Sequence, residues 1–337
     1  MTVDQDTFAP SSLRDQHDSD SEEFAYPSPW ETSAVCQRWR NLTLSSPGLW
    51  PYIQLGAHAL ALTPYYFDLQ FERSGNRPVF LRLDDSLHKR GHSYDITSSI
   101  LSSEAHRYQG LNLVLTGITT DPLPTELMDF PILRKLRIMS CADTRAFQTA
   151  AQLTHLSIGG GLDLEAPFAQ FNPWTKLQFL HFNEVYILPS TLLAILRQAP
   201  NIYALDLDRC GSSFVEGEEL HMAVVTLPSL RYLHLHFGVY RFTSQILATR
   251  INDTHLDHLK VSEVDAGDLQ AVAMFLGSRS GSAHVTAFKL VSSWRYSVTE
   301  ASLLESVLLS VLRGLPALQR LYIHLQGGYG HYTLNPL

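Results

Sequence analysis

A recurring apolar pattern constrains the fold of this chain more than any other feature of its sequence. The pattern is apolar-x-x-apolar-x-apolar, which is typical of a strand with one buried face. Eight copies follow one another: Leu133/Leu136/Ile138, Leu153/Leu156/Ile158, Leu177/Leu180/Phe182, Ile202/Leu205/Leu207, Leu230/Leu233/Leu235, Leu256/Leu259/Val261, Val285/Phe288/Leu290 and Leu318/Leu321/Ile323. Their middle positions are separated by 20, 24, 25, 28, 26, 29 and 33 residues. Such a period predicts a solenoid, in which each repeat buries its apolar side only against its neighbours.

The repeating unit resembles the strand segment of a leucine-rich repeat. Helices are predicted between the strands, at 144–152, 189–199, 217–226, 268–277 and 301–313. Because crossovers between parallel strands are right-handed, we expect an α/β leucine-rich-repeat solenoid, a horseshoe with a parallel sheet on its concave face. This domain is expected to span residues 56–337, with Leu81/Leu83 and Leu111/Leu113/Leu115 as candidate earlier copies. For the edge of the last strand the sequence leaves three possibilities: it is exposed, it is covered by the glycine-rich tail, or it is covered by a partner.

The cysteines fit this repeat better than they fit a chemical role. Cys141 and Cys210 each follow the last apolar position of a copy by three residues. That is the Asn/Cys site of the repeat, where a small polar group bonds to the backbone at the turn. Together with Cys36 they have neither metal-ligand spacing nor the number needed for a disulfide framework. We therefore assign no catalytic thiol, no metal ligand and no cofactor.

The residues between and beside the apolar positions of each copy are expected on the concave face. In leucine-rich-repeat proteins generally this face is the binding surface, and here it is polar, rich in histidine and interspersed with aromatic residues. The candidate partner-binding residues on it are His181, Asp206, Asp208, Tyr232, His234, His236, Lys260, Tyr322 and His324.

Two carboxylates and two imidazoles are expected to meet on that face. Asp206 and Asp208 belong to one copy and His234 and His236 to the next, and adjacent strands lie about 4.8 Å apart. Three interpretations remain open: a metal site, an acid–base pair, and a solvated face where Asp and His pair loosely. We favour the solvated face, since an open sheet rarely excludes water. The same histidines offer a route to pH-sensitive partner binding.

An amphipathic segment precedes the repeats at residues 34–50. Val35, Trp39 and Leu42 recur at helical spacing, which predicts one helix with these side chains on a shared face. Pro47 cannot continue a helix, so the helix is expected to stop before it. Residues 1–29 before this segment are polar and acidic, with Asp15, Asp18, Asp20, Glu22 and Glu23 in nine positions. We expect this stretch to be a disordered tail.

Residues Val35, Cys36, Trp39, Arg40, Ser46, Pro47, Leu49 and Trp50 match the pattern V-C-x-x-W-R followed by S-x-P-x-L-W. This resembles the second half of an F-box of the large fungal class, and Glu72-Arg73-Ser74-Gly75 with Pro78 resembles the segment after it. The resemblance implies a subunit that recruits substrates to a Skp–cullin–F-box ubiquitin ligase. The family's opening leucine-rich helices do not precede Val35, so residues 30–55 form a partial F-box, truncated at its N-terminal half. Its Skp-binding candidates are Val35, Cys36, Trp39, Arg40, Leu44, Leu49 and Trp50.

Charge and hydropathy exclude several other classes of protein. The formal net charge of −8 comes without a Lys/Arg cluster, which argues against nucleic-acid binding. The chain has no run of 18 apolar residues and no secretory signal, so we expect no membrane span and a location in the cytoplasm, the nucleus or both. Gly-x-Ser-x-Gly, Walker and His-Glu-x-x-His motifs are absent from the sequence.

Three functional hypotheses follow from the sequence. The first is a non-catalytic adaptor that contacts a Skp-family subunit of a cullin ligase through the partial F-box and holds a protein substrate on the concave face. The second is an orphan interaction module that has lost Skp contact, with residues 34–55 capping the first strand. The third is an enzyme that uses the Asp/His patch. Substituting Trp39 by Ala separates the first two, since a cap would lose stability and a Skp anchor would lose binding.

Overall fold

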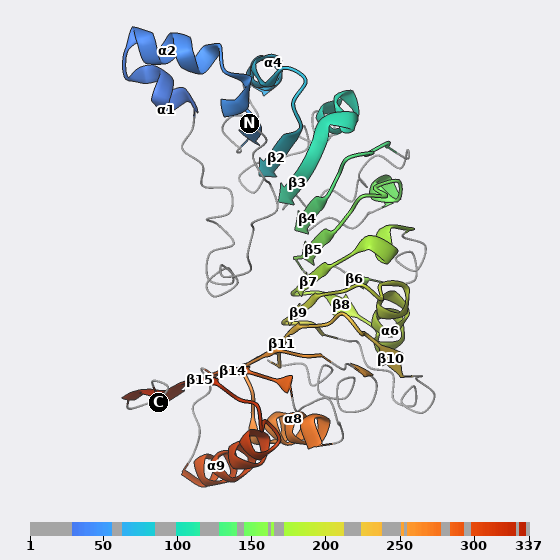
Figure 1. Cartoon of the computed structure of the whole chain (residues 1–337), viewed down its shortest axis with the longest axis vertical. Coiled ribbons are helices and arrows are strands. Elements are labelled where there is room, and N and C mark those ends of the chain that lie inside the picture. Colours follow the sequence, from blue (N-terminus) through green and yellow to red (C-terminus); the bar gives the residue numbers. More distant parts are fainter. Residues whose placement is uncertain are drawn as a thin grey trace.

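The computed structural model of the chain describes residues 29–55, 63–84, 99–114, 128–139, 145–160, 163–164, 172–211, 224–237, 251–252, 255–277, 284–292, 298–327 and 330–334. Over these ranges the protein is an α/β structure built on one large sheet (Figure 1). The tail predicted at 1–29 lies outside them, except for Pro29, which begins the first helix. No helix in the described ranges has the length and apolar character needed to cross a bilayer.

The main sheet follows the order of the sequence. Its strands are β1 (Tyr52–Leu55), β2 (Val79–Asp84), β3 (Tyr108–Val114), β4 (Lys135–Met139), β5 (His155–Gly159), β7 (Phe179–Asn183), β9 (Ala204–Asp208), β11 (Tyr232–His236), β13 (His258–Ser262), β14 (Ala287–Ser292), β15 (Arg320–Gly327) and β16 (Gly330–Leu334). Neighbours from β1 to β15 are parallel, and β16 is antiparallel to β15. The strands stack along a curved line, with the helix α6 on the outer side (Figure 1).

Helices and short elements connect the strands. The helices are α1 (Pro29–Ala34), α2 (Gln37–Leu44), α4 (Thr63–Ser74), α6 (Pro189–Gln198), α8 (Ala266–Gly277) and α9 (Val298–Arg313). The 3-10 turns are η3 (Pro47–Leu49), η4 (Ala105–Arg107), η5 (Arg145–Phe147) and η7 (Asn172–Lys176). Two further two-stranded parallel sheets pair β6 (Asp163–Leu164) with β8 (Tyr186–Ile187), and β10 (Val225–Thr226) with β12 (Ile251–Asn252).

Each of the eight predicted strand copies forms a strand of the main sheet, as do the two earlier candidates in β2 and β3. The strands pair in register, so that equivalent apolar positions form continuous buried rows. One row runs through Leu136, Leu156, Leu180, Leu205 and Leu233, each at most 2% exposed. These rows pack against apolar side chains of α6, α8 and α9 in a single core.

Two predicted helices are wrong where the structure describes them. Of segment 144–152 the structure describes residues 145–152, where the only helical element is the 3-10 turn η5, because the 20-residue repeat leaves too little chain for a longer crossover. In segment 217–226, Val225–Thr226 forms strand β10, in keeping with its β-branched run from Val224, and residues 217–223 lie outside the described ranges. The other three predicted helices are confirmed as α6, α8 and α9.

The chain leaves the sheet through a repeated left-handed turn. Gly160, Glu184, Arg209 and Glu263 each directly follow a main-sheet strand, and each has φ between 50° and 90°. The backbone N–H of Glu184 donates to the Asp208 carbonyl at 2.9 Å, and that of Glu263 donates to the Val291 carbonyl at 2.8 Å. This turn extends the ladder past the strand ends, where it helps to keep the repeats in register.

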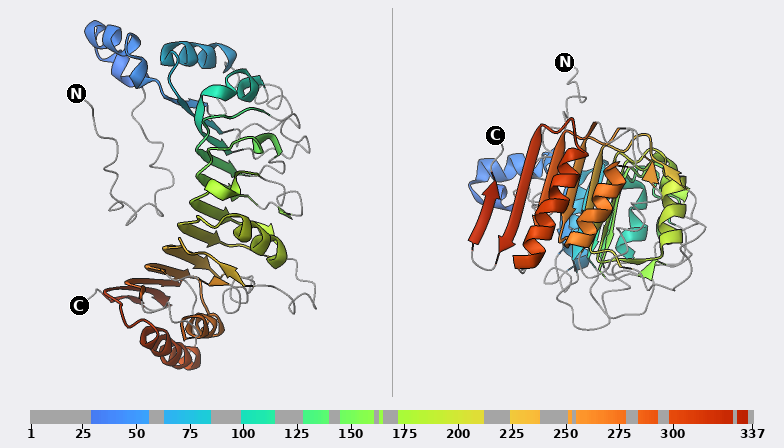
Figure 2. Two further views of the ribbon diagram at one scale, coloured as in Figure 1. Left: turned by 45° about the vertical axis from the view of Figure 1, so that its right-hand side comes forward. Right: turned by 90° about the horizontal axis from the view of Figure 1, so that it is seen from below.

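The chain itself covers the edge of the last parallel strand. Strand β16 pairs with β15 from Ile323↔Leu334 to Gly327↔Gly330. The two strands form a hairpin beside the C-terminus, visible in the left view of Figure 2. Of the three coverings left open by the sequence, the glycine-rich tail is therefore the one found.

Candidate functional site

Helix α2, the residue Val35 before it and the turn η3 after it expose apolar side chains to solvent. Val35 is 70% exposed, Trp39 50% and Leu42 55%, and Leu44 and Leu49 are also exposed. We call these five residues the N-terminal apolar surface. The segment that carries them stands at one end of the curved sheet, beyond α4 (Figure 1).

The single helix predicted from residue 34 is wrong in its first turn. Residues 35 and 36 separate α1 from α2, and Cys36 is the N-cap of α2 in an extended conformation (φ −160°, ψ 169°). Cys36 is free and exposed. Arg40, also exposed, donates from Nε to the Ser33 carbonyl at 3.2 Å and so ties α2 back to α1. The helix ends at Leu44, before Pro47, as expected.

Trp50 belongs to the core and is not part of the Skp-facing surface predicted for it. It is 1% exposed, and its indole N–H donates to the Thr43 carbonyl at 2.9 Å. The guanidinium of Arg73 lies 4.7 Å from the centre of the indole ring. These contacts join α2, α4 and the start of β1 around one side chain. The two tryptophans of this segment therefore have different surroundings, Trp50 buried and Trp39 half-exposed.

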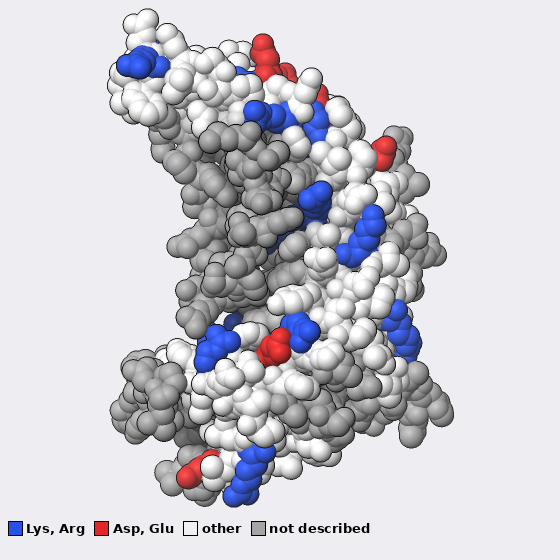
Figure 3. Space-filling model, in the orientation of Figure 1, with Lys and Arg blue, Asp and Glu red and all other residues white. Residues whose placement is uncertain are grey.

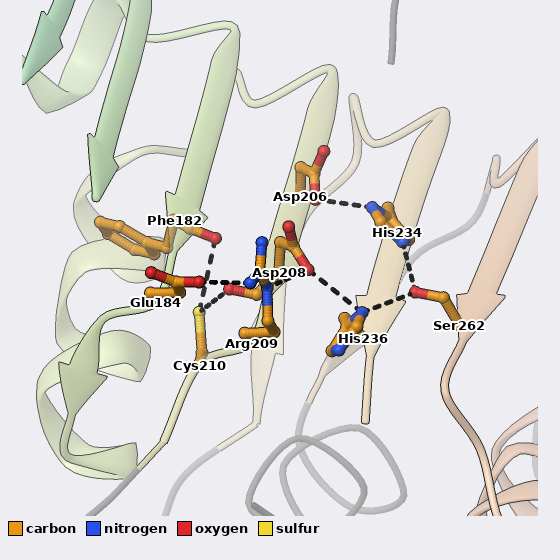
Figure 4. A network of polar contacts seen from close by, with 9 residues as sticks. All are labelled: Phe182, Glu184, Asp206, Asp208, Arg209, Cys210, His234, His236 and Ser262. Carbon is orange, nitrogen blue, oxygen red and sulfur yellow. Dashed lines mark hydrogen bonds and ion pairs between the residues drawn. The ribbon is translucent and has the colours of Figure 1, made fainter. Parts of the chain in front are cut away.

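The carboxylates and imidazoles predicted to meet on the sheet do come together. His234 Nδ1 lies 2.7 Å from Asp206 Oδ1, and His236 Nδ1 lies 3.1 Å from Asp208 Oδ1. Ser262 on β13 joins the two pairs, because its Oγ lies 2.9 Å from His234 Nε2 and 3.1 Å from His236 Nδ1. Figure 4 shows these five residues as one chain of contacts across β9, β11 and β13, and we call them the Asp–His–Ser network.

Three of the five network residues are buried, so the favoured expectation of a solvated face with loose pairing is wrong at Asp206, His234 and Ser262. Asp206 is fully buried, His234 is 4% exposed and Ser262 is 6% exposed. Each is flanked by side chains of the neighbouring strands. With Asp206 ionised, Nδ1 of His234 carries a proton and donates it to the carboxylate, which leaves a neutral Nε2 to accept from the Ser262 hydroxyl.

His236 occupies the more open end of the network. Burial lowers the pKa of its imidazole below the usual 6.5, and the nearby carboxylates of Asp208 and Glu263 act in the opposite direction. His181, predicted on the other side of Asp206, is its register neighbour on β7. It is 6% exposed, and its Nδ1 lies 3.0 Å from Ser157 Oγ.

Asp206, His234 and Ser262 have the hydrogen-bond order of a Ser–His–Asp hydrolase triad. Such a triad also uses N–H donors beside the serine to stabilise an oxyanion. Here the N–H of Glu263 donates to the Val291 carbonyl at 2.8 Å, and the N–H of Phe237 donates to the Ser262 carbonyl at 2.9 Å. The donors next to the serine are thus engaged in the sheet, and its hydroxyl contacts two imidazoles. This arrangement is suited to joining three strands.

The described ranges also show how possible metal ligands and one cysteine are placed. No group of three or more His, Cys, Asp or Glu residues there is arranged to hold a metal ion. Cys210 is buried, with its Sγ 3.5 Å from the Phe182 carbonyl oxygen and 3.6 Å from that of Asp208. This is the turn-stabilising role expected from its place in the repeat, and burial raises the pKa of its thiol. Cys141 lies outside the described residues.

The remaining partner-binding candidates lie further along the sheet. Tyr232 and Lys260 are half-buried on β11 and β13, and burial raises the pKa of the Tyr232 hydroxyl. Tyr322 is 41% exposed and His324 is half-buried on β15. On the face drawn in Figure 3, Lys and Arg side chains are spread along the length of the molecule and do not form one stripe.

Ser262, which connects the two Asp–His pairs, was not among the site residues predicted from the sequence. The sequence did contain a signal for it, since Ser262 occupies the same repeat position as Asp208 and His236.

No protein-family model matches the chain, and no curated protein matches it in sequence.

Proposed function

We propose that this protein is a non-catalytic adaptor of a Skp–cullin–F-box ubiquitin ligase, built on a leucine-rich-repeat horseshoe. In this proposal the N-terminal apolar surface contacts a Skp-family subunit, and the exposed face of the main sheet holds a protein target. The observation that carries it is the exposure of Val35, Trp39 and Leu42 on and beside a short helix.

Apolar side chains on α2 are exposed to water, which is unfavourable. A helix in a globular protein normally turns its apolar side chains toward the core. On α2 the only buried residue is Thr43, whereas Trp39 and Leu42 face water. Exposed apolar patches with polar surroundings mark interaction sites. The V-C-x-x-W-R resemblance names the partner, since in F-box proteins this helix belongs to the domain that binds the Skp subunit.

The orphan-module hypothesis remains the second candidate, and Trp50 favours part of it. This buried side chain links α2 to α4 and precedes β1, as a cap on the first strand requires. The capping role therefore belongs to Trp50 and not to Trp39. The two hypotheses still differ in whether the exposed surface binds a Skp-family protein.

Co-purification with a Skp-family adaptor tests the proposal. The full chain is compared with Trp39→Ala and Leu42→Ala, and with Tyr65→Ala as a control that removes a more exposed aromatic side chain from α4. We expect the full chain and the control to retain the adaptor and both α2 variants to lose it. A folded full chain that retains no adaptor would support the orphan module instead.

A further inference from the structure

Three adjoining strands near the C-terminal end of the sheet expose a basic and aromatic surface. On β13, β14 and β15 the apolar residues Leu259, Val261, Phe288, Leu290 and Ile323 are buried. The alternate positions face the other way, and they carry His258, Lys260, Lys289, Arg320 and Tyr322, which are exposed or half-buried. We call these five residues the basic strip. Among the described side chains of these three strands, none on that face is acidic.

The strip places like charges next to one another. Lys260 and Lys289 are register partners on neighbouring strands, about 4.8 Å apart at the backbone, and like charges directly opposite are destabilising. Lys289 in turn lies opposite Tyr322, with its Nζ 5.0 Å from the ring centre. His258 lies two strands from its register equivalent Arg320, and burial first and Arg320 second lower the pKa of its imidazole.

Within the ranges that the structure describes, acidic side chains lie at both ends of β13. Asp257 precedes the strand and pairs with Arg231 at 3.5 Å, and Glu263 follows it at the left-handed turn. Further away, Asp208 is engaged with His236. The positive charges of the strip are therefore concentrated on one face of a chain whose net charge is −8. A face that gathers cationic side chains in this way is suited to an anionic ligand.

We propose that the basic strip binds an acidic peptide segment of a partner protein. The inference rests on the proposed function, because it names the chemistry of the target held on the sheet. In an extended peptide, alternate side chains on one face are about 7 Å apart, and flexible Lys and Arg side chains on strands about 4.8 Å apart can reach such a spacing. The half-exposed ring of Tyr322 adds an apolar contact between them. A nucleic acid fits less well, since the strip is short and the chain as a whole repels a polyanion.

The test is a direct binding measurement on the full chain. The probe is a short fluorescein-labelled peptide of alternating Glu and Ser with a central Leu. The control peptide carries Gln in place of each Glu. Fluorescence anisotropy, measured at low and high salt, should show that the chain binds the Glu peptide and does not bind the Gln peptide. That binding should weaken as salt screens the exposed charges.

Two triple variants with equal loss of charge locate the site. The strip variant carries Lys260→Gln, Lys289→Gln and Arg320→Gln. The control carries Lys176→Gln, Arg197→Gln and Arg313→Gln, which are exposed positions on η7, α6 and α9. We expect the strip variant to weaken the dissociation constant for the Glu peptide at least about tenfold and the control less than about twofold. Circular dichroism checks that both variants are folded.

Four results would overturn the proposal. They are equal binding of the Gln peptide, an equal loss in the control variant, tighter binding of a single-stranded oligonucleotide, and tighter peptide binding when Asp15, Asp18, Asp20, Glu22 and Glu23 are neutralised. The last result would identify the chain's own acidic segment as the occupant. Skp-family binding is measured in separate samples, so failure of the strip leaves the N-terminal surface untouched, and the reverse also holds.

Discussion

Replacing each tryptophan of the N-terminal segment by alanine is expected to separate folding from partner binding. Truncating a buried tryptophan costs about 3–5 kcal/mol. For Trp50 this includes about 1 kcal/mol for the hydrogen bond from its indole N–H to the Thr43 carbonyl. Stacking of Arg73 on the indole contributes about 0.5–1 kcal/mol. We therefore expect Trp50→Ala to destabilise the first strands of the sheet by about 3–5 kcal/mol.

The same change at Trp39 should have a much smaller effect on folding. Burying a large apolar side chain completely contributes about 1.5–3 kcal/mol, and Trp39 is 50% exposed. Its removal should therefore cost about 1 kcal/mol. If the proposed function is right, Trp39→Ala should nevertheless lose a Skp-family adaptor in co-purification.

Hydrogen exchange provides the stability assay, because a solenoid can open locally at one end while the rest stays folded. Amides of β1 and β2 report on the affected end in each variant, and amides of β9 serve as an internal reference. The reasoning fails if Trp39→Ala raises exchange in β1 and β2 as much as Trp50→Ala does. It also fails if Trp39→Ala leaves adaptor binding unchanged.

Three further predictions concern the sheet. Gly159→Ala should destabilise by about 1–3 kcal/mol in urea unfolding, because the new Cβ would lie 2.7 Å from Met139 Sδ and 2.9 Å from a backbone carbonyl; Gly277→Ala, with open space, should be near neutral. Asp206→Ala should lower the free energy of unfolding by about 3–5 kcal/mol, because it removes the acceptor of a buried imidazole. Asp208→Ala should lower it by less, because Asp208 is partly exposed. The pKa of His236 lies below 6.5 in the folded chain, so on acidification the imidazole takes up its proton in the unfolded chain first. The contribution of His236 to the free energy of unfolding should therefore be constant above about pH 7. It should fall as the pH drops from 6.5 through the folded pKa. His236→Gln should flatten that decline, and an unchanged slope would contradict the assignment.

The strands were predictable because the apolar positions of a repeat must form rows. A buried leucine such as Leu205 has equivalents on both neighbouring strands, and the period of the pattern reveals them without any structure. Strand β1 was missed although Trp50, Ile53 and Leu55 have the spacing of the unit, because Trp50 was interpreted as part of the F-box-like motif. The connections between the strands were harder to predict, since short crossovers form helices, 3-10 turns or small strands according to their length and their content of β-branched residues.

Burial was the least predictable property of the candidate site. The helical pattern predicted a shared face for Val35, Trp39 and Leu42, but it did not show whether these side chains meet the core or the solvent. On the sheet, the repeat positions brought Asp206 beside His234, whereas the burial of that pair depends on how tightly the side chains of successive strands pack. Ser262 contributes because serine can accept and donate at once, so it completes a network that four titratable residues alone leave open.

The positions of the two proposed surfaces bear on what a recruiting protein requires. The N-terminal apolar surface stands beyond β1, whereas the basic strip lies on β13 to β15, at the other end of the stack of strands (Figure 1). In a solenoid each repeat contacts only its neighbours, so changes at the two ends should act independently. The chemistry of the surfaces also differs, since one is apolar and the other cationic. If both proposals are right, the two surfaces would let the chain hold two unlike partners at once, which is the geometric condition for an adaptor.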